Sequence, residues 1–139
     1  MFFDTKSLPD TAILVSAEIL LWVVYAWAWG YNFLEWIYIT QGVQHDPIIT
    51  SDYGDQLPLT TVFGKRHIDT MTEGQYNSIP FNAVGLSQIQ KWDLTKLCLR
   101  GRADVEDLPP PVGEYEIAFH SYQKGLPYRP MLHITYYPA

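Results

Sequence analysis

Residues 11–40 read TAILVSAEILLWVVYAWAWGYNFLEWIYIT, a stretch without lysine or arginine and with only two acids, Glu18 and Glu35. The 16 uncharged residues from Ile19 to Leu34 would span roughly 24 Å as a helix, less than the roughly 30 Å hydrocarbon core of a bilayer. Extending the helix into the flanking apolar residues makes it long enough and leaves both acids near the membrane boundaries, where a carboxylate costs less. This pattern predicts a transmembrane helix; a buried helix in a soluble assembly is the alternative.

Turn-forming residues frame this helix and divide the rest of the chain. Pro9 suits a first helical turn, and Gly42 follows the helix end. Nine of the ten prolines come after the helix, so we expect only a thin core there. The predicted fold is a membrane protein with a single transmembrane helix, followed by a small, irregular α+β extramembrane region. Its predicted parts are an N-terminal extension (1–8), the helix (9–40), a linker (41–57) and a small domain (58–139) that ends in a β-hairpin (114–137).

The helix predicts an integral membrane location, with an energy-transducing inner membrane favoured, whether mitochondrial, bacterial or photosynthetic. Its orientation is weakly encoded, because Lys6 is the only basic residue near either end and the next one is Lys65. Positive charge favours the cytoplasmic side of a membrane. The N-terminus is therefore expected on the cytoplasmic or matrix side.

One face of the predicted helix is expected to contact other membrane helices. Tryptophans recur every seven residues, and small residues beside them would let a second helix approach closely. A carboxylate and an asparagine on this face require hydrogen-bonding partners in a membrane. The predicted interface consists of Glu18, Trp22, Tyr25, Ala26, Trp29, Gly30, Asn32 and Trp36. The alternative is that the tryptophans face lipid.

The C-terminal segment predicts a hairpin with strands over 114–122 and 131–137. A register that pairs Phe119 with Ile134 brings two apolar rows together and places His120 opposite His133. Two facing histidines could share a metal ion, although this polar face would also hold solvated or partner-bonded histidines. The long connection between the strands is expected to contact a partner through Leu126, Pro127, Tyr128 and Arg129.

Several functional classes are disfavoured by the sequence. A net charge of -6 leaves no basic face for nucleic acid. The scattered glycines form neither a P-loop nor a dinucleotide fingerprint. Cys98, between two leucines, is typical of a small buried residue and not of a nucleophile. No cofactor is expected to be bound by this chain alone, although lipid is expected at the helix surface and a pigment or quinone at an interface stays open.

The predicted function is that of a non-catalytic accessory subunit in a multi-subunit membrane complex, either respiratory, ATP-synthesising or photosynthetic. One helix and an extended tail would anchor and stabilise the assembly. The expected partners are other integral membrane subunits and membrane lipid, and not nucleic acid. Two alternatives stay open: a membrane-anchored binding module that uses the hairpin edge, and a small metal-binding membrane protein that uses His120 and His133.

Overall fold

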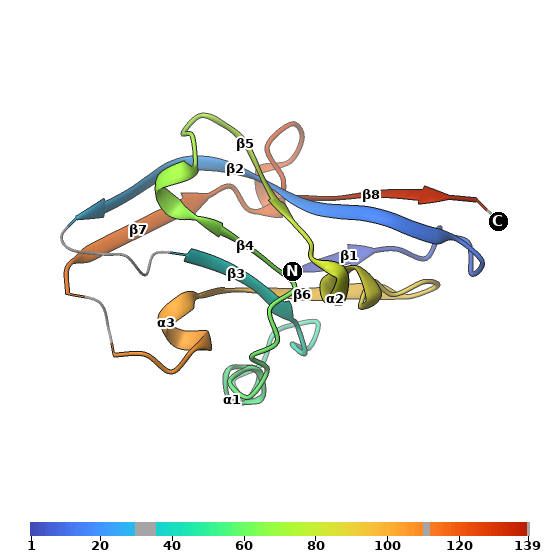
Figure 1. Ribbon diagram of the computed structural model, residues 1–139, viewed down its shortest axis with the longest axis horizontal. Helices are drawn as coiled ribbons and strands as arrows, with labels where there is room; N and C mark the ends of the chain where they lie inside the picture. Colours follow the sequence, from blue (N-terminus) through green and yellow to red (C-terminus); the bar gives the residue numbers. More distant parts are fainter. Residues whose placement is uncertain (30–35, 110–111, 139) are drawn as a thin grey trace.

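The computed structural model describes residues 1–29, 36–109 and 112–138. Two four-stranded antiparallel sheets contain most of the regular structure (Figure 1). The first sheet has the order β1 (Phe2–Asp4), β6 (Leu94–Gly101), β3 (Trp36–Gln41) and β4 (Gly64–His67). The second sheet is built on β2 (Ile13–Trp29), with β5 (Gln75–Pro80) on one side and both β7 (Glu114–Phe119) and β8 (Met131–Tyr137) on the other.

The helices are short and lie in the connections. The α-helices are α1 (Asp52–Gln56), α2 (Ala83–Ser87) and α3 (Arg102–Val105), and the single 3-10 turns are η1 (Ile68–Thr70) and η2 (Tyr122–Lys124). In the described ranges, no helix combines the length and the apolar character that crossing a membrane requires. The predictions of a transmembrane helix, and of the integral membrane location that rested on it, are therefore wrong, as is the alternative of a buried helix.

The middle of the apolar stretch forms a strand that is buried on one face and partly covered on the other. Leu21 lies in the core, whereas its neighbours Leu20 and Trp22 point to the outer face and are half-buried there. A strand with two covered faces has a continuous apolar run, which cannot be told from a buried helix by periodicity. The many β-branched and aromatic residues of β2 were the signal that favoured a strand.

Two irregular points in β2 hid the alternation expected of a strand. Ile19, Leu21 and Val23 are all fully buried, as alternate residues on one face should be. The pairing register shifts on either side of this segment, before Ser16 and after Val23. Because a β-bulge adds one residue to a strand, it moves the following side chains to the opposite face. Ala26, at an even position, consequently packs against the core.

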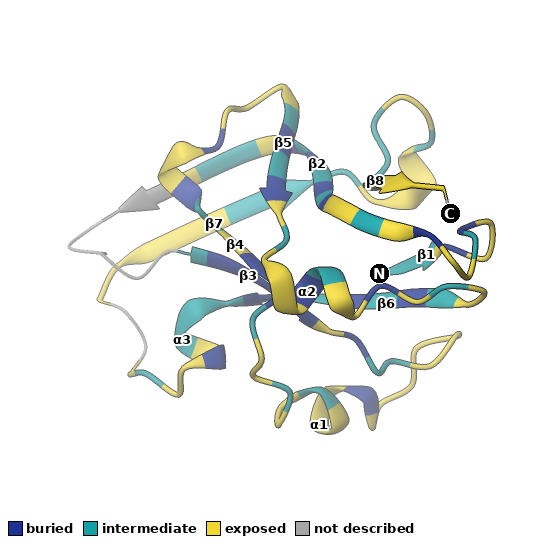
Figure 2. Cartoon of the chain, turned by 45° about the vertical axis from the view of Figure 1, so that its right-hand side comes forward, coloured by how far each residue is buried: buried dark blue, intermediate teal, exposed yellow. Residues whose placement is uncertain are grey.

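The core lies between the two sheets and joins residues predicted for the membrane helix, such as Ile19 and Ile39, to residues predicted for the extramembrane region, such as Phe63 and Leu97. Among the residues that the structure describes, its buried side chains are those of Ile19, Leu21, Val23, Ile37, Ile39, Phe63, Ile68, Met71, Ile79 and Leu97. Residues 2–4, predicted as part of an extension, form β1 at the edge of the first sheet. Figure 2 shows the buried segments in β3, β5 and the middle of β2, whereas β7 and β8 are half-buried or exposed along their whole length.

The predicted C-terminal hairpin is also wrong in its pairing. β7 and β8 form close to the expected positions, but both run antiparallel to β2. β7 pairs with residues 23–29 of β2, and β8 pairs with residues 13–20. They therefore follow one side of β2 one after the other (Figure 1). A strand of 17 residues is long enough to accept both.

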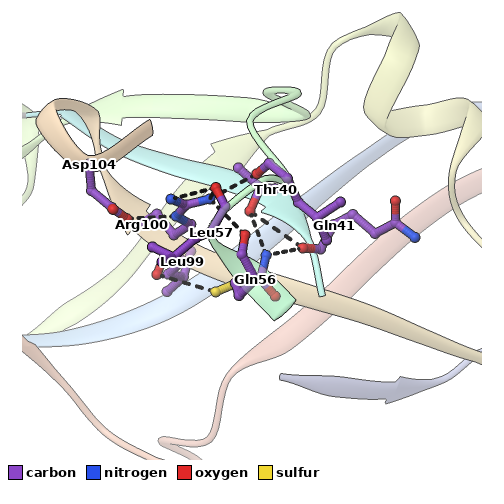
Figure 3. Close-up of polar contacts among 9 residues, drawn as sticks. Thr40, Gln41, Gln56, Leu57, Leu99, Arg100 and Asp104 are labelled. Atoms are coloured by element: carbon purple, nitrogen blue, oxygen red, sulfur yellow. Dashed lines mark hydrogen bonds and ion pairs between the residues drawn. The ribbon is translucent and has the colours of Figure 1, made fainter. Parts of the chain in front are cut away.

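The predicted linker is held in place by a buried arginine of β6. The Arg100 guanidinium donates hydrogen bonds to the Gln56 carbonyl oxygen at 3.1 Å and to the Asp104 carboxylate at 2.6 Å (Figure 3). It also donates to the carbonyl oxygen of Leu59 at 2.9 Å. The hydrogen bond that Arg100 donates to the Asp104 carboxylate raises the pKa of Arg100. Arg100 is only 7% exposed, so its positive charge depends on these oxygens for the solvation that water would otherwise supply.

Candidate interaction edge

The residues of the predicted helix interface lie in different places. Glu18, Trp22 and Tyr25 are on the outer face of β2, whereas Trp36 begins β3 in the other sheet, where its ring meets that of His67 at 5.1 Å. Ala26 faces the core. The Trp29 side chain, Gly30 and Asn32 lie outside the described residues. The predicted stripe is not formed, because it required a helical repeat.

The outer face of β2 carries an aromatic cluster made by the chain itself. The Trp22 ring makes edge-on contacts with Tyr76 of β5 at 5.2 Å and with Tyr128 at 4.9 Å. The Tyr76 hydroxyl donates to the carbonyl oxygens of Pro127 and, at 3.0 Å, Arg129. The connection between β7 and β8 thus packs back onto its own sheet. Leu126, one of the four residues predicted to contact a partner, is 71% exposed.

The two histidines proposed as metal ligands occupy separate surroundings. His120 contacts the Tyr128 ring at 5.2 Å, and its backbone N–H donates to the Trp22 carbonyl oxygen. His133 instead faces Glu18, with His133 Nδ1 3.1 Å from Glu18 Oε1. The metal prediction depended on a hairpin register that does not form. In the described parts of the chain, no three histidine, cysteine or acidic side chains are grouped to hold a metal ion.

Glu18 links three strands on this face. Its carboxylate accepts a hydrogen bond from the Ser78 hydroxyl of β5 and interacts with His133 of β8. These hydrogen bonds, first from Ser78 and then from His133, lower the pKa of Glu18 against a smaller opposing effect of burial. Serine and histidine both bind the carboxylate and not each other, so the arrangement joins three strands and is not a nucleophile–base pair.

One cleft, of about 430 Å³, lies beside β3, β4 and α3. Its polar floor is the Tyr38 hydroxyl, which donates to Glu106 Oε1 at 2.5 Å, while Arg102 Nε donates to Glu106 Oε2 at 2.8 Å. Burial, followed by the hydrogen bond to Glu106, raises the pKa of Tyr38 to about 12. Both Glu106 carboxylate oxygens are engaged and Tyr38 stays neutral, so neither side chain is positioned as a free acid or base at neutral pH.

Two further reactive groups, the Cys98 thiol and the Asp52 carboxylate, are also poorly suited to catalysis. Cys98 is half-buried, and desolvation raises the pKa of its thiol, which disfavours the reactive thiolate. Asp52 is buried and accepts hydrogen bonds from the backbone of Ile49 at 2.8 Å and from the His45 ring at 2.6 Å. Burial acts against these bonds, yet together they lower the pKa of Asp52. The acid organises a loop, and none of the hydrogen bonds among the described residues joins His45 to a nucleophile.

The outermost strands of the two sheets differ in how their free edges are protected. Natural proteins guard such edges with charge, proline or short length, because unpaired backbone groups accept further strands. β1 has only three residues. The protecting residues are Asp4 in β1, Lys65 and Arg66 in β4, Pro80 in β5, and Glu114 and Glu116 in β7. Where β2 extends beyond β5, the Glu73 carboxylate accepts from the Ala26 N–H at 3.0 Å.

β8 has none of these protections. Its seven residues, MLHITYY, include no proline and no lysine, arginine, aspartate or glutamate. It pairs with β2 on one side only, so about half of its backbone N–H and C=O groups point away from the sheet. Tyr137 is 66% exposed. Sequence reasoning located this strand, and its binding-module alternative used the hairpin edge, but it paired the strand with β7 and not with β2.

Comparisons of the chain with protein-family models, with curated proteins and with solved structures give no match. Its function must therefore be inferred from its own geometry.

Proposed function

We propose that this chain is a non-catalytic binding module that accepts an extended protein segment as an additional strand on β8. The observation that carries the proposal is the contrast among the outermost strands, since β8 alone of these described strands is long, uncharged and free of proline. Strand addition supplies affinity through backbone hydrogen bonds and specificity through alternate side chains.

The surroundings of β8 support this mode of binding. The strand is anchored along its inner side by pairing with residues 13–20 of β2. Leu132 and Ile134 face inward and pack against core residues, so the strand is fixed before any partner arrives. A pre-ordered edge lowers the conformational entropy that binding must overcome. An added segment would lie beside a rigid template.

The accessory-subunit prediction stays untested, but it has lost the helix that was its main support. A role in holding an assembly together remains compatible with a strand-accepting edge. The proposal therefore keeps the non-catalytic role of that prediction, but the contact surface is the edge of β8 and not a face of a membrane helix.

A selection from random displayed peptides would test the proposal. Peptides enriched on the wild-type protein should alternate apolar and polar residues, bind with measurable fluorescence anisotropy, and slow amide hydrogen exchange in residues 131–137. Binding should fall at least tenfold in Thr135→Lys, which places a charge on the exposed outer side of β8. Thr61→Lys, an equal change at an exposed position away from any strand, is the matched control. Equal binding to all three proteins, or protection elsewhere in the chain, would contradict the proposal.

A further inference from the structure

We infer that the strand accepted by β8 is the β8 strand of a second copy of this chain. The inference rests on the proposed function and names its partner. Two copies would pair antiparallel about a two-fold axis perpendicular to the sheet, the commonest symmetry of protein oligomers. The second sheets of the two molecules would then continue through β5, β2 and β8 of one copy into β8, β2 and β5 of the other.

The sequence of β8 is complementary to itself in this arrangement. A perpendicular two-fold axis requires opposed residues to lie on the same face, and the register centred on Ile134 opposes all seven residues of the strand. Ile134 then meets Ile134, and Leu132 meets Tyr136, on the inner face. On the outer face Met131 meets Tyr137, a thioether–aromatic contact.

The polar pair completes this register. His133 lies opposite Thr135 of the second copy, and each pair occurs twice. Because His133 Nδ1 is directed to Glu18, its Nε2 is the nitrogen able to accept from the threonine hydroxyl. All cross-strand pairs along the seven residues are therefore apolar or hydrogen-bonded.

Charge also selects this edge for self-association. The chain carries a net charge of -6, so two copies repel each other over most surfaces. β8 has no charged residue, and the nearby Glu18 carboxylate is engaged by Ser78 and His133. Pairing of β7 with itself would instead bring Glu116 close to its own copy. The strand at which two copies would repel each other least, β8, is therefore also the strand with the open edge.

The expected dimer is reversible and concentration-dependent. A single pair of seven-residue strands buries a small interface, at the low end of specific protein contacts. Exposed apolar side chains at the end of the strand add to it, with Tyr137 66% and Tyr136 38% exposed in the single chain.

Sedimentation velocity from micromolar to near-millimolar concentration tests the inference. Wild type and Thr61→Lys should shift from monomer to dimer over this range, whereas Thr135→Lys should stay monomeric with an unchanged circular dichroism spectrum. If Thr135→Lys did not fold, Tyr137→Lys, at an exposed residue at the end of the strand, would carry the same test. A wild type that is monomeric throughout, or a folded Thr135→Lys that dimerises like wild type, would overturn the inference. Peptide binding at β8 by a monomeric wild type would leave the proposed function standing.

Discussion

His133 of β8 faces Glu18 of β2 across the strand pair, with Nδ1 3.1 Å from Oε1. The same carboxylate accepts from Ser78 of β5, so three strands of the second sheet meet at one acid. This contact fixes the side of β2 on which β8 lies and leaves the opposite edge of β8 open.

Replacing Glu18 by Gln is expected to destabilise the fold by about 1 kcal/mol near pH 7, because charge-assisted hydrogen bonds are lost from a partly exposed site. The folded pKa of Glu18 is lowered from 4.5. A lowered carboxylate pKa stabilises the fold above 4.5, and this contribution is lost as pH falls through the folded value. Urea unfolding of both proteins between pH 7 and 3 should show the difference shrinking below about pH 4.5. A difference that is constant with pH would contradict the assigned role.

Leu21 and Leu20 test the two faces of β2. Leu21 is 0% exposed in the core, whereas Leu20 is half-buried on the outer face. Leu21→Ala should cost about 3 kcal/mol through lost burial and a residual cavity, and Leu20→Ala about 1 kcal/mol. Urea midpoints measure both. Equal losses would contradict the unequal burial of the two faces of β2.

Arg100 is buried, whereas Arg102 on the adjacent element is half-exposed, so the two arginines can be compared directly. Lysine cannot reproduce the several directed hydrogen bonds of arginine. Arg100→Lys should therefore leave carbonyl oxygens of residues 56–59 unsatisfied, cost about 2 kcal/mol, and speed hydrogen exchange in α1. Arg102→Lys, at a half-exposed ion pair with Glu106, should change stability little. Similar hydrogen-exchange rates in α1 for both variants would contradict the role of Arg100 in holding residues 56–59.

Tyr38 should titrate well above the ordinary tyrosine pKa of 10. Its pKa is raised to about 12 by burial and by the hydrogen bond to Glu106. Ultraviolet absorbance of tyrosinate should lose a late transition near pH 12 in Tyr38→Phe. Glu106→Gln should move that transition to lower pH, because the negative neighbour is removed. The raised pKa also means that this tyrosine stabilises the fold fully below pH 10 and loses that effect as pH rises towards 12. A transition that Tyr38→Phe leaves unchanged would disprove this assignment.

The sequence allowed the C-terminal strands to be predicted but not their pairing. β8 is rich in β-branched and aromatic residues, and its inner residues alternate with outer ones, so local pattern was enough to locate it. Its partner lies more than a hundred residues earlier in the sequence. Because β2 was assigned to a helix, β7 was taken as the partner of β8. The prediction that His120 lies opposite His133 followed from that error.

The misassignment of β2 has a physical cause. Its outer residues, including Trp22, are covered by Tyr76 and by the connection that carries Tyr128. That cover is a tertiary contact, and the two bulges that rotate the strand are tertiary as well. A strand that is apolar on both faces and interrupted twice lacks the period that local reasoning detects. The sequence suggested that the edge of the predicted hairpin could bind a partner, but which side of β8 is open follows only from its pairing with β2.

Cysteine cross-linking tests the register of the β8 pair most directly. In a Cys98→Ser background, Ile134→Cys places two thiols opposite each other at the two-fold axis, where opposed Cα atoms lie about 5 Å apart and within reach of a disulfide. Tyr137→Cys places its two thiols at opposite ends of the paired strands, about 20 Å apart. Mild oxidation of the folded proteins should give a covalent dimer with Ile134→Cys and none with Tyr137→Cys. No dimer with Ile134→Cys, or equal dimer with both variants, would contradict self-pairing of β8.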